Sequence, residues 1–549
     1  MRRSGPHFES RLLAAVVAAF SLLTSAACQP RGPALRNLIL VSVDTLRQDA
    51  LGCYGNARVK TPHIDALAKD GVLFRQAFTH APSTLPSHSS MFFSEYPWNL
   101  GVFHNGDKLA LREASLQHLL KGKGYTTAAF TSLAVLKASY GLAQGFDEYA
   151  DDVSRNPGRP YLFADEVNDR VLPWLSAHYQ QPFFLFIHYS DPHEPYVARN
   201  APADAELLLN EQPVGSFCFL KREAHSVELE LKPGRNTLVF RKLPRFEARD
   251  ARGYEIQRLR LSDPGVRVTP VAGKLDADDV MRFSDAASYS LENKTQRSIA
   301  VQLDFRGKAS VGPRRMREQY FREVEWVDGA IGKLVAWLKA HDSYESCLLL
   351  LVADHGEALG ERGSFGHETQ LYLSQLRIPF ILVDHRRAGL EVNAPVTLLD
   401  LAPTALARLG IPRPGAWKGR DLSELIDRPD SGNRQQADVF SATFFSGRDR
   451  STLAHSKLSV LRPPHHLIVS LPSGRHEFYD IGADPGERTN LLRDAKHPDG
   501  YDALVASAGA LARETEFHLR SRKASDIPEE QMEQLKALGY LGGSQDPKE

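Results

Sequence analysis

The chain has 549 residues, a formal net charge of zero, and ordinary shares of hydrophobic (42%) and charged (24%) residues. This length exceeds what a single hydrophobic core normally supports, so we expect more than one domain. The balanced charge, without a long run of one sign, argues against a dedicated nucleic-acid-binding protein and against a protein that binds anionic membranes through its surface charge.

The N-terminus has the pattern of an export signal. Two arginines precede an apolar run from Leu12 to Leu23, and small residues follow up to Cys28. The run is short for a transmembrane helix, so we interpret residues 1–28 as a secretory signal peptide. Its ending, SAAC, resembles a bacterial lipobox, which predicts a lipoprotein of the bacterial envelope (periplasm or outer membrane) anchored by lipidated Cys28. Residues 29–36 would be the linker, and ordinary cleavage or a retained anchor are the alternatives.

Apolar strands alternate with helices over residues 37–200 and again over residues 314–430. The runs NLILVSV, PFFLFIHY and CLLLLV read as buried parallel strands, and helices are expected at TPHIDALAKDG, SLQHLLKGKG and roughly 316–339. VLFRQAFT reads as a further strand. This alternation predicts an α/β fold with a mostly parallel sheet flanked by helices, forming a catalytic domain in two parts.

Two other regions differ in texture. Residues 201–313 alternate with period two, as in VELELKPGRNTLVFRKL, which predicts an inserted β-rich domain of sandwich type. Residues 431–549 are expected to form a smaller C-terminal α+β subdomain.

Polar residues follow the predicted strands directly. Asp44 ends the first run, Asp191 and His193 follow the second, and Asp354 and His355 follow the third. Sites in parallel sheets form beyond the carboxyl ends of strands, so we expect these side chains to meet.

The segment APSTLPSHSS allows two interpretations of Thr84. The residue can cap a helix that begins there, which is the commoner role on this segment alone, or it can be a nucleophile at a helix N-terminus that welcomes an anion. Ser83 and Ser87 are rival nucleophiles, but we interpret them as capping or surface residues.

If Asp44, Thr84, Asp354 and His355 converge, they form an oxygen-rich site for one divalent cation such as Mn²⁺, Ca²⁺, Mg²⁺ or Zn²⁺. The cation would activate the Thr84 hydroxyl and polarise a bound phosphate or sulfate group. His193 and His367 could then neutralise its oxygens or protonate the leaving oxygen.

The ordered motifs LILVSVDTLRQDALGCYG, APSTLPSHSS, GYTTAAF, GFDEY, PFFLFIHYSDPHEPY, VADHGEALGERGSFGHE and FYDIGADPGERTNL resemble the sulfatase family of the alkaline phosphatase superfamily. The resemblance covers nearly the whole chain after the signal, except the β insertion. It implies that Asp44, Asp354 and His355 bind the metal ion and that Thr84 is the nucleophile, also touching the metal.

The resemblance also implies roles for three further residues. His193 and His367 match positions that contact the transferred group. Asn105, in GVFHNG, lies where some relatives hold a phosphate oxygen, and a loop-turn asparagine is the equal alternative.

Three departures from the family pattern bear on the chemistry. Thr84 stands where sulfatases carry the Cys or Ser that is oxidised to formylglycine, and His88 stands where that maturation motif has arginine. Thr45 replaces an expected second acid after Asp44. The sulfate-clamping segment GKWH of many sulfatases is replaced by TSLAVLKAS. We therefore expect no formylglycine, and phosphoester or phosphodiester chemistry rather than classical sulfate hydrolysis.

These observations predict a metal-dependent hydrolase or transferase of sulfate or phosphate esters, with Thr84 as nucleophile. Its substrate could carry a glycan or a lipid head group; no nucleic acid is expected, and membrane contact only through the lipid anchor. A two-metal variant would use Asp191, His193 and His367 at a second ion. The alternative is a catalytically decayed surface lipoprotein that binds glycan or envelope polymer through the inserted β domain.

Overall fold

The computed structural model describes residues 35–521 except 154–160, 195, 197–202, 204, 218, 220–223, 244–250, 276–279, 285, 312, 429–437, 445–455, 472 and 495–497. The expected signal peptide, Cys28 and nearly all of the linker therefore lie outside the described residues. None of the helices in the described ranges combines the length and apolar character that a bilayer crossing needs.

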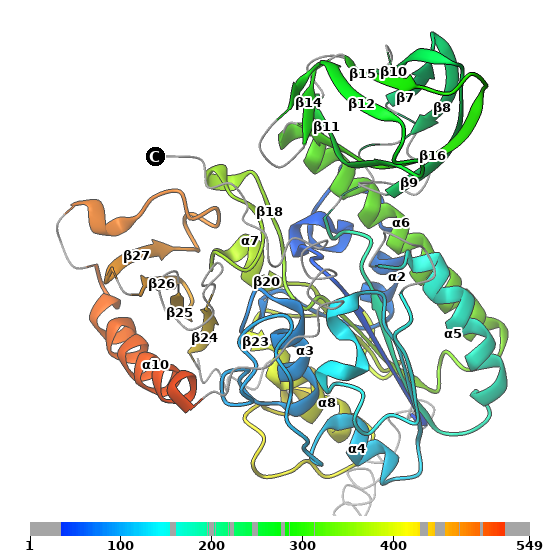
Figure 1. Ribbon diagram of the computed structural model, residues 1–549. Coiled ribbons are helices and arrows are strands. Elements are labelled where there is room, and N and C mark those ends of the chain that lie inside the picture. The colour runs from blue at the N-terminus through cyan, green and yellow to red at the C-terminus, as the bar shows by residue number, and fades with distance from the viewer. Residues whose placement is uncertain are drawn as a thin grey trace, which may run out of the picture.

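A twisted sheet lies at the centre of the catalytic part (Figure 1). It has eight strands in the order β22-β2-β21-β17-β1-β6-β4-β5. Its strands are β1 (Asn37–Val43), β2 (Val72–Phe74), β4 (Thr126–Phe130), β5 (Glu148–Ala150), β6 (Phe183–Tyr189), β17 (Cys347–Val352), β21 (Phe380–Val383) and β22 (Leu390–Val392). β1 runs parallel to both β17 and β6, and only β21 runs antiparallel to its neighbours. The predicted α/β fold with a mostly parallel sheet is confirmed.

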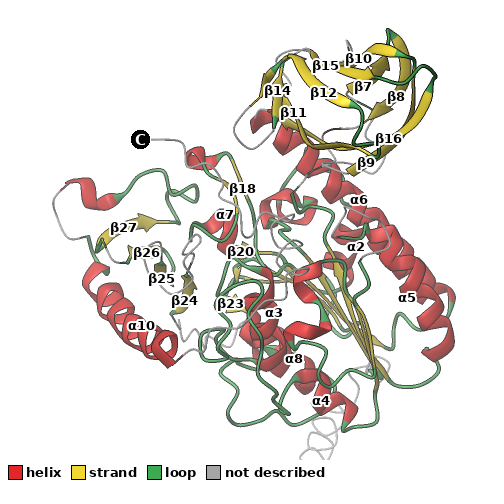
Figure 2. Cartoon of the chain, in the orientation of Figure 1, coloured by secondary structure: helices red, strands yellow, loops and turns green. Residues whose placement is uncertain are grey.

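Helices cover both faces of this sheet (Figures 1 and 2). On one face α2 (Pro62–Asp70) and α5 (Ala164–His178) pack against α6 (Pro313–Ala340), and on the other α3 (Thr84–Phe93) packs against α4 (Leu116–Lys121) and α8 (Leu401–Arg408). Because both faces are covered, every residue of β1, β6 and β17 is buried, which explains their continuous apolar runs.

Short helical segments connect these elements. They are η1 (Gln48–Ala50), η2 (Gly52–Tyr54), η3 (Ala134–Leu136), η4 (Ala138–Tyr140), η6 (Glu361–Gly363), α7 (Leu373–Leu376), η7 (Leu398–Asp400), α9 (Ser423–Asp427) and η8 (Leu491–Asp494).

The segment VLFRQAFT, predicted as one strand, forms two. β2 belongs to the central sheet, whereas β3 (Ala77–Phe78) pairs with β20 (Arg377–Ile378) and β23 (Val396–Thr397). The chain leaves the central sheet between them, where Arg75 pairs with Glu391. The polar pair Arg75 and Gln76 interrupts the apolar pattern at this change of partner. A further hairpin joins β18 (Ala358–Leu359) to β19 (Phe365–Gly366).

The segment from β7 to β16 forms two five-stranded antiparallel sheets with a separate hydrophobic core, at the top of Figure 1. The strands are β7 (Ala205–Leu209), β8 (Gln212–Phe217), β9 (Ala224–Leu231), β10 (Gly234–Lys242), β11 (Ala251–Leu261), β12 (Arg267–Ala272), β13 (Lys274–Leu275), β14 (Met281–Phe283), β15 (Ala286–Asn293) and β16 (Ile299–Val311). Residues 233–236, Pro-Gly-Arg-Asn, do not close a hairpin between β9 and β10, because these strands belong to different sheets.

The C-terminal part is a four-stranded antiparallel sheet covered by one helix. Its elements are β24 (Val439–Thr443), β25 (Lys457–Arg462), β26 (His465–Ser470), β27 (Arg475–Asp480) and α10 (Tyr501–Ser521). An apolar cluster that includes Phe78, Leu371, Val439 and Tyr479 packs this sheet against the catalytic part.

Candidate active site

The carboxyl ends of two neighbouring strands bring two acidic side chains together. Asp44 directly follows β1, and its backbone N–H donates to the Tyr189 carbonyl at the end of β6 over 2.8 Å. Asp354 follows β17 after one intervening residue, Ala353. Both carboxyl groups are fully buried. Parallel pairing of β1 with β17 therefore joins acids that are far apart in the sequence.

The backbone uses one oxygen of Asp354. Oδ1 accepts hydrogen bonds from the N–H groups of Thr45 (3.2 Å) and His355 (2.8 Å). Thr45 has φ 57°, a left-handed conformation that β-branched residues rarely adopt, and its hydroxyl donates to the Asp44 carbonyl over 2.7 Å. These bonds fix the carboxylate so that Oδ2 faces the site.

His355 presents a nitrogen to the same point. Its Nδ1 lies 2.9 Å from the Gly356 carbonyl, which places the ring proton on Nδ1 and the lone pair on Nε2. Nε2 lies 3.8 Å from Asp44 Oδ1 and 3.5 Å from Asp354 Oδ2. Burial lowers the pKa of His355 to about 3, with His367 nearby acting in the same direction, so the ring is neutral.

Three of these atoms fit a divalent cation. Within the described residues, Asp44 Oδ1, Asp354 Oδ2 and His355 Nε2 have no hydrogen-bond partner, and ligand atoms of the three residues lie within 4.8 Å of one another. A buried polar atom without a partner costs roughly 1–3 kcal/mol. Two carboxylates and a neutral imidazole are ligands that Mn²⁺ and Zn²⁺ accept.

The two carboxyl groups compete for ionisation. Burial raises the pKa of Asp354 well above its usual range, and the nearby charge of Asp44 raises it further. Burial would also raise the pKa of Asp44, but the imidazoles of His188, His193 and His355 outweigh it and lower that pKa. A cation between the two groups would remove this competition.

Thr84 lies beside this cluster. Its Oγ1 donates to Asp44 Oδ2 over 3.3 Å, and the side chain is fully buried. The residue is the first of α3 rather than its N-cap, because Ser83 holds the N-cap position with φ −155°. All ten residues of α3 are buried, so the positive end of an internal helix points to Thr84.

The two rival serines have other partners. Ser83 Oγ donates to Glu368 Oε1 over 2.8 Å instead of capping α3. Ser87 Oγ donates to the Ala81 carbonyl over 2.6 Å and is fully buried, so it is not a surface residue. Ser87 belongs to α3, whose residues are all buried, and the local sequence did not show this burial.

His367 and His193 lie next to the cluster. The ring centroid of His367 is 4.5 Å from that of His355 and 5.1 Å from that of His193. Glu357 Oε1 lies 3.2 Å from His367 Nδ1. Burial disfavours a charged ring, but the charge of Glu357 outweighs it and raises the pKa of His367 to about 9. His193 Nδ1 lies 2.7 Å from the Glu194 carbonyl.

Asn105 and Asp191 support helix N-termini. Asn105 Oδ1 accepts from the Leu85 N–H over 2.8 Å, and its Nδ2 donates to Glu368 over 3.0 Å. The side chain of Asn105 thus contacts the backbone of Leu85, the residue that follows Thr84. Both oxygens of Asp191 face the Ala164 N–H at the start of α5, at 3.1 and 3.0 Å.

Sequence reasoning did not single out His188 and gave His88 no role in the site. His188 Nε2 lies 3.4 Å from Asp44 Oδ2. His88 Nδ1 lies 2.7 Å from the Thr84 carbonyl, and burial lowers its pKa to about 3. For His188, the sequence did contain a signal. This histidine lies inside the apolar strand FFLFIHY, where a buried polar group needs a partner.

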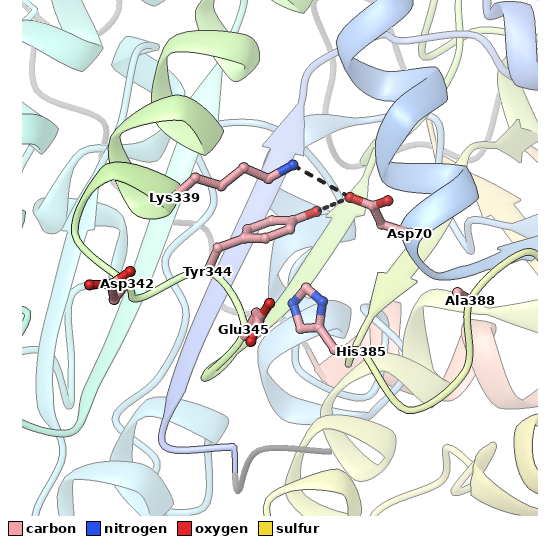
Figure 3. Close-up of a pocket in the computed structure, with 7 residues that line it drawn as sticks. All are labelled: Asp70, Lys339, Asp342, Tyr344, Glu345, His385 and Ala388. Atoms are coloured by element: carbon pink, nitrogen blue, oxygen red, sulfur yellow. Dashed lines mark hydrogen bonds and ion pairs between the residues drawn. The ribbon is translucent and has the colours of Figure 1, made fainter. Parts of the chain in front are cut away.

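A hollow of about 510 Å³ lies at the opposite end of the parallel strands, where β17 begins. Figure 3 shows Lys339 and Tyr344 directed at Asp70 on its wall, at 3.7 and 2.8 Å. Tyr344 precedes β17, whereas Asp354 follows that strand. The hollow is therefore separate from the cluster at the carboxyl edge.

Comparison with known proteins identifies the family of this chain. The model of the family described as Sulfatase matches residues 36–411. The ulvan-active sulfatase of Formosa agariphila is 25% identical over 476 residues, which cover 84% of this chain and 78% of that protein.

Two solved structures share the fold. The phosphonate monoester hydrolase of Agrobacterium radiobacter superposes with a TM-score of 0.58 at 18% identity, covering 88% of this chain and 96% of that chain. A protein solved in complex with its substrate D-glucosamine-2-N,6-O-disulfate superposes with a TM-score of 0.59 at 16% identity, covering 88% and 98%. Because the family model spans more than half of the chain, this protein belongs to the sulfatase family of ester hydrolases, within the alkaline phosphatase superfamily.

Proposed function

We propose that this protein is a metal-dependent hydrolase or transferase that uses Thr84 as its nucleophile and acts on phosphoesters or phosphodiesters in preference to sulfate esters. One observation carries the proposal. The Thr84 hydroxyl lies at the N-terminus of a buried helix and 3.3 Å from Asp44. The other oxygen of Asp44 belongs, with atoms of Asp354 and His355, to a set of clustered ligand atoms that have no hydrogen-bond partner within the described residues.

The metal would be held by Asp44, Asp354 and His355, with Thr84 beside it. When bound, a divalent cation lowers the pKa of an adjacent hydroxyl and polarises the oxygen of a bound ester. The candidate ions are Mn²⁺, Ca²⁺, Mg²⁺ and Zn²⁺, and metal analysis of the purified protein distinguishes them.

The protein's own groups would carry the bond changes. Thr84 Oγ attacks phosphorus while the bond to the leaving oxygen breaks, and the Thr84 proton is directed at Asp44 Oδ2. The imidazolium of His367, favoured by Glu357, would protonate the leaving oxygen. Water or an alcohol would then cleave the phosphothreonine ester and restore the hydroxyl.

Two features of the sequence support phosphoryl transfer. A threonine side chain is a secondary alcohol and cannot be oxidised to the aldehyde formylglycine. His88, which stands at the arginine position of the maturation motif, bonds to the Thr84 carbonyl and to Ser42 instead. The phosphonate monoester hydrolase of similar fold supports this chemistry by analogy alone.

A glycan or lipid head group remains the proposed carrier of the ester. The solved complex with a sulfated glucosamine concerns another protein. The two-sheet insertion is compatible with a polymeric substrate, and the competing proposal, a binding lipoprotein without turnover, rests on the same insertion.

The test is a substrate panel with the purified protein loaded with each of the four metals. We expect aryl phosphodiester or phosphomonoester turnover to exceed aryl sulfate turnover, and Thr84 to be found esterified after acid quenching and peptide mass spectrometry. Preferred sulfate hydrolysis would overturn the phosphoryl assignment. No turnover with any metal, together with retention on a glycan column, would favour the binding lipoprotein.

A further inference from the structure

His188 is a fully buried histidine within a strand that is otherwise almost entirely apolar. It lies on β6, in register with Ser42 of β1, and its ring packs near that of Phe186. A hydrophobic residue would fill this position without the cost of burying two ring nitrogens. We therefore expect polar contacts of the two ring nitrogens to offset the cost of burying His188.

The two ring nitrogens face two different groups. Nδ1 lies 2.8 Å from the hydroxyl of Ser132, a buried residue in the segment that follows β4. Nε2 lies 3.4 Å from Asp44 Oδ2, and it forms no hydrogen bond with the described residues. The contact is long for a hydrogen bond, and hydrogen bonds at active sites often tighten only in the complex with substrate.

The two oxygens of Asp44 have different surroundings. Oδ1 faces His355 Nε2 at 3.8 Å and has no hydrogen-bond partner in the described ranges. Oδ2 faces Thr84 Oγ1 at 3.3 Å and His188 Nε2 at 3.4 Å. One oxygen is thus directed at the ligand cluster, and the other at two side chains.

We infer that His188, oriented by Ser132, is a positioning residue that holds Asp44 Oδ2 and thereby aims Oδ1 at the divalent cation. In this arrangement the Ser132 hydroxyl donates to Nδ1, and the Nε2–H donates to Asp44. This inference rests on the proposed metal-dependent, Thr84-based chemistry.

The proposed covalent step gives the contact between His188 and Asp44 a second role. An esterified Thr84 Oγ has no hydrogen to donate, so Asp44 Oδ2 would lose that partner when the bond to phosphorus forms. His188 would keep the oxygen paired throughout the reaction. Partners of this kind on ligating groups typically change metal affinity or activity by about 10–100-fold.

A second metal site is the competing explanation. His88, His188 and Asp354 also have ligand atoms within 4.8 Å of one another. However, His88 Nδ1 lies 2.7 Å from the Thr84 carbonyl and His88 Nε2 lies 3.0 Å from Ser42 Oγ, so neither nitrogen is free to bind an ion.

The experiment compares His188→Met with His188→Gln in the full-length mature protein. Met fills a similar volume without a donor, whereas the Gln amide can still donate toward Asp44. The readouts are Mn²⁺ affinity by titration calorimetry, and kcat and KM on an aryl phosphodiester. We expect His188→Met to weaken Mn²⁺ binding by about 10–100-fold and to lower kcat with little change in KM, and His188→Gln to recover a large part of both.

Two serine substitutions, Ser132→Ala and its control Ser459→Ala, test the same contact with a smaller change in the buried site. Ser459, His466 and Glu487 form a second buried Ser–His–carboxylate chain in the C-terminal sheet, with Ser459 Oγ 2.6 Å from His466 Nε2. Ser132→Ala should weaken Mn²⁺ binding, whereas Ser459→Ala should leave it unchanged. This pair keeps the question testable if His188→Met does not fold.

Two results would overturn the inference: wild-type Mn²⁺ affinity in both His188→Met and Ser132→Ala, or equal losses in His188→Met and His188→Gln. An Mn²⁺ stoichiometry of two in the wild type, reduced to one in His188→Met, would assign the second metal site instead. Because Mn²⁺ binding is measured without substrate, failure of the proposed esterase activity would show separately, as a metal-loaded wild type without turnover.

Discussion

The Thr84 hydroxyl donates to Asp44 Oδ2 over 3.3 Å, which joins the first residue of helix α3 to the end of strand β1. The same carboxylate directs its other oxygen at His355. A single acid thus links the proposed nucleophile to the proposed metal ligands.

Replacing Thr84 should separate catalysis from folding. Ser83, not Thr84, holds the N-cap position, so the cost of Thr84→Ala should be that of the lost hydrogen bond to Asp44, roughly 1–3 kcal/mol of stability. Its turnover should fall by several orders of magnitude while metal binding persists. Thr84→Ser should keep part of the activity. With Mn²⁺, Mg²⁺ or Ca²⁺ bound, Thr84→Cys should be slow because a thiolate is a poor ligand for a hard ion. Wild-type phosphodiester turnover by Thr84→Ala would return Thr84 to a structural role.

Asp354→Asn should lose metal binding without loss of the fold. The Asn Oδ1 can still accept from the Thr45 and His355 N–H groups. Removing the acid also relieves the like-charge competition with Asp44 that raises the pKa of Asp354. The metal-free Tm should therefore stay equal or rise, whereas the increase in Tm on adding Mn²⁺ should disappear. His355→Ala should likewise abolish bound metal, and a tightly bound ion that survives both changes would contradict the ligand assignment.

Glu357 should control the charge of His367 in the metal-free protein. With Glu357 present, the pKa of His367 is raised to about 9, although burial opposes it. In Glu357→Gln the charges of Glu368 and Asp44 still oppose burial but the largest favourable contribution is gone, so the His367 pKa should fall below its wild-type value, as followed by histidine NMR. The raised pKa also stabilises the fold fully below pH about 6.5, and this stability is lost as pH rises through about 9. A His367 pKa unchanged in Glu357→Gln would show that another group holds the proton.

A substitution of Cys28, which lies outside the described residues, tests where the protein is located in the cell. We propose that its lipidation anchors the protein in the bacterial envelope. Cys28→Ser should move the protein from the membrane fraction to the soluble fraction, because one lipid-modified residue would be the only anchor. A variant that stays membrane-bound would identify the apolar run from Leu12 to Leu23 as a retained anchor.

The sequence by itself determined the fold class and the family. Buried parallel strands must be apolar along their whole length, so runs such as NLILVSV identified the central sheet and placed Asp44 at its carboxyl edge. The order of several motifs along the chain identified the sulfatase family, which the family model confirms.

The tertiary structure decided which partners each side chain has. The sequence could not show that Asp191 faces the N–H at the start of α5, or that Ser87 is buried, because these contacts join residues from elements whose relative placement depends on packing. His188 is the clearest case. Its strand was predicted, but its contact with Asp44 depends on the pairing of β6 with β1, and its contact with Ser132 depends on the segment after β4. Local sequence sets which elements form, whereas long-range pairing sets which polar groups share a buried site.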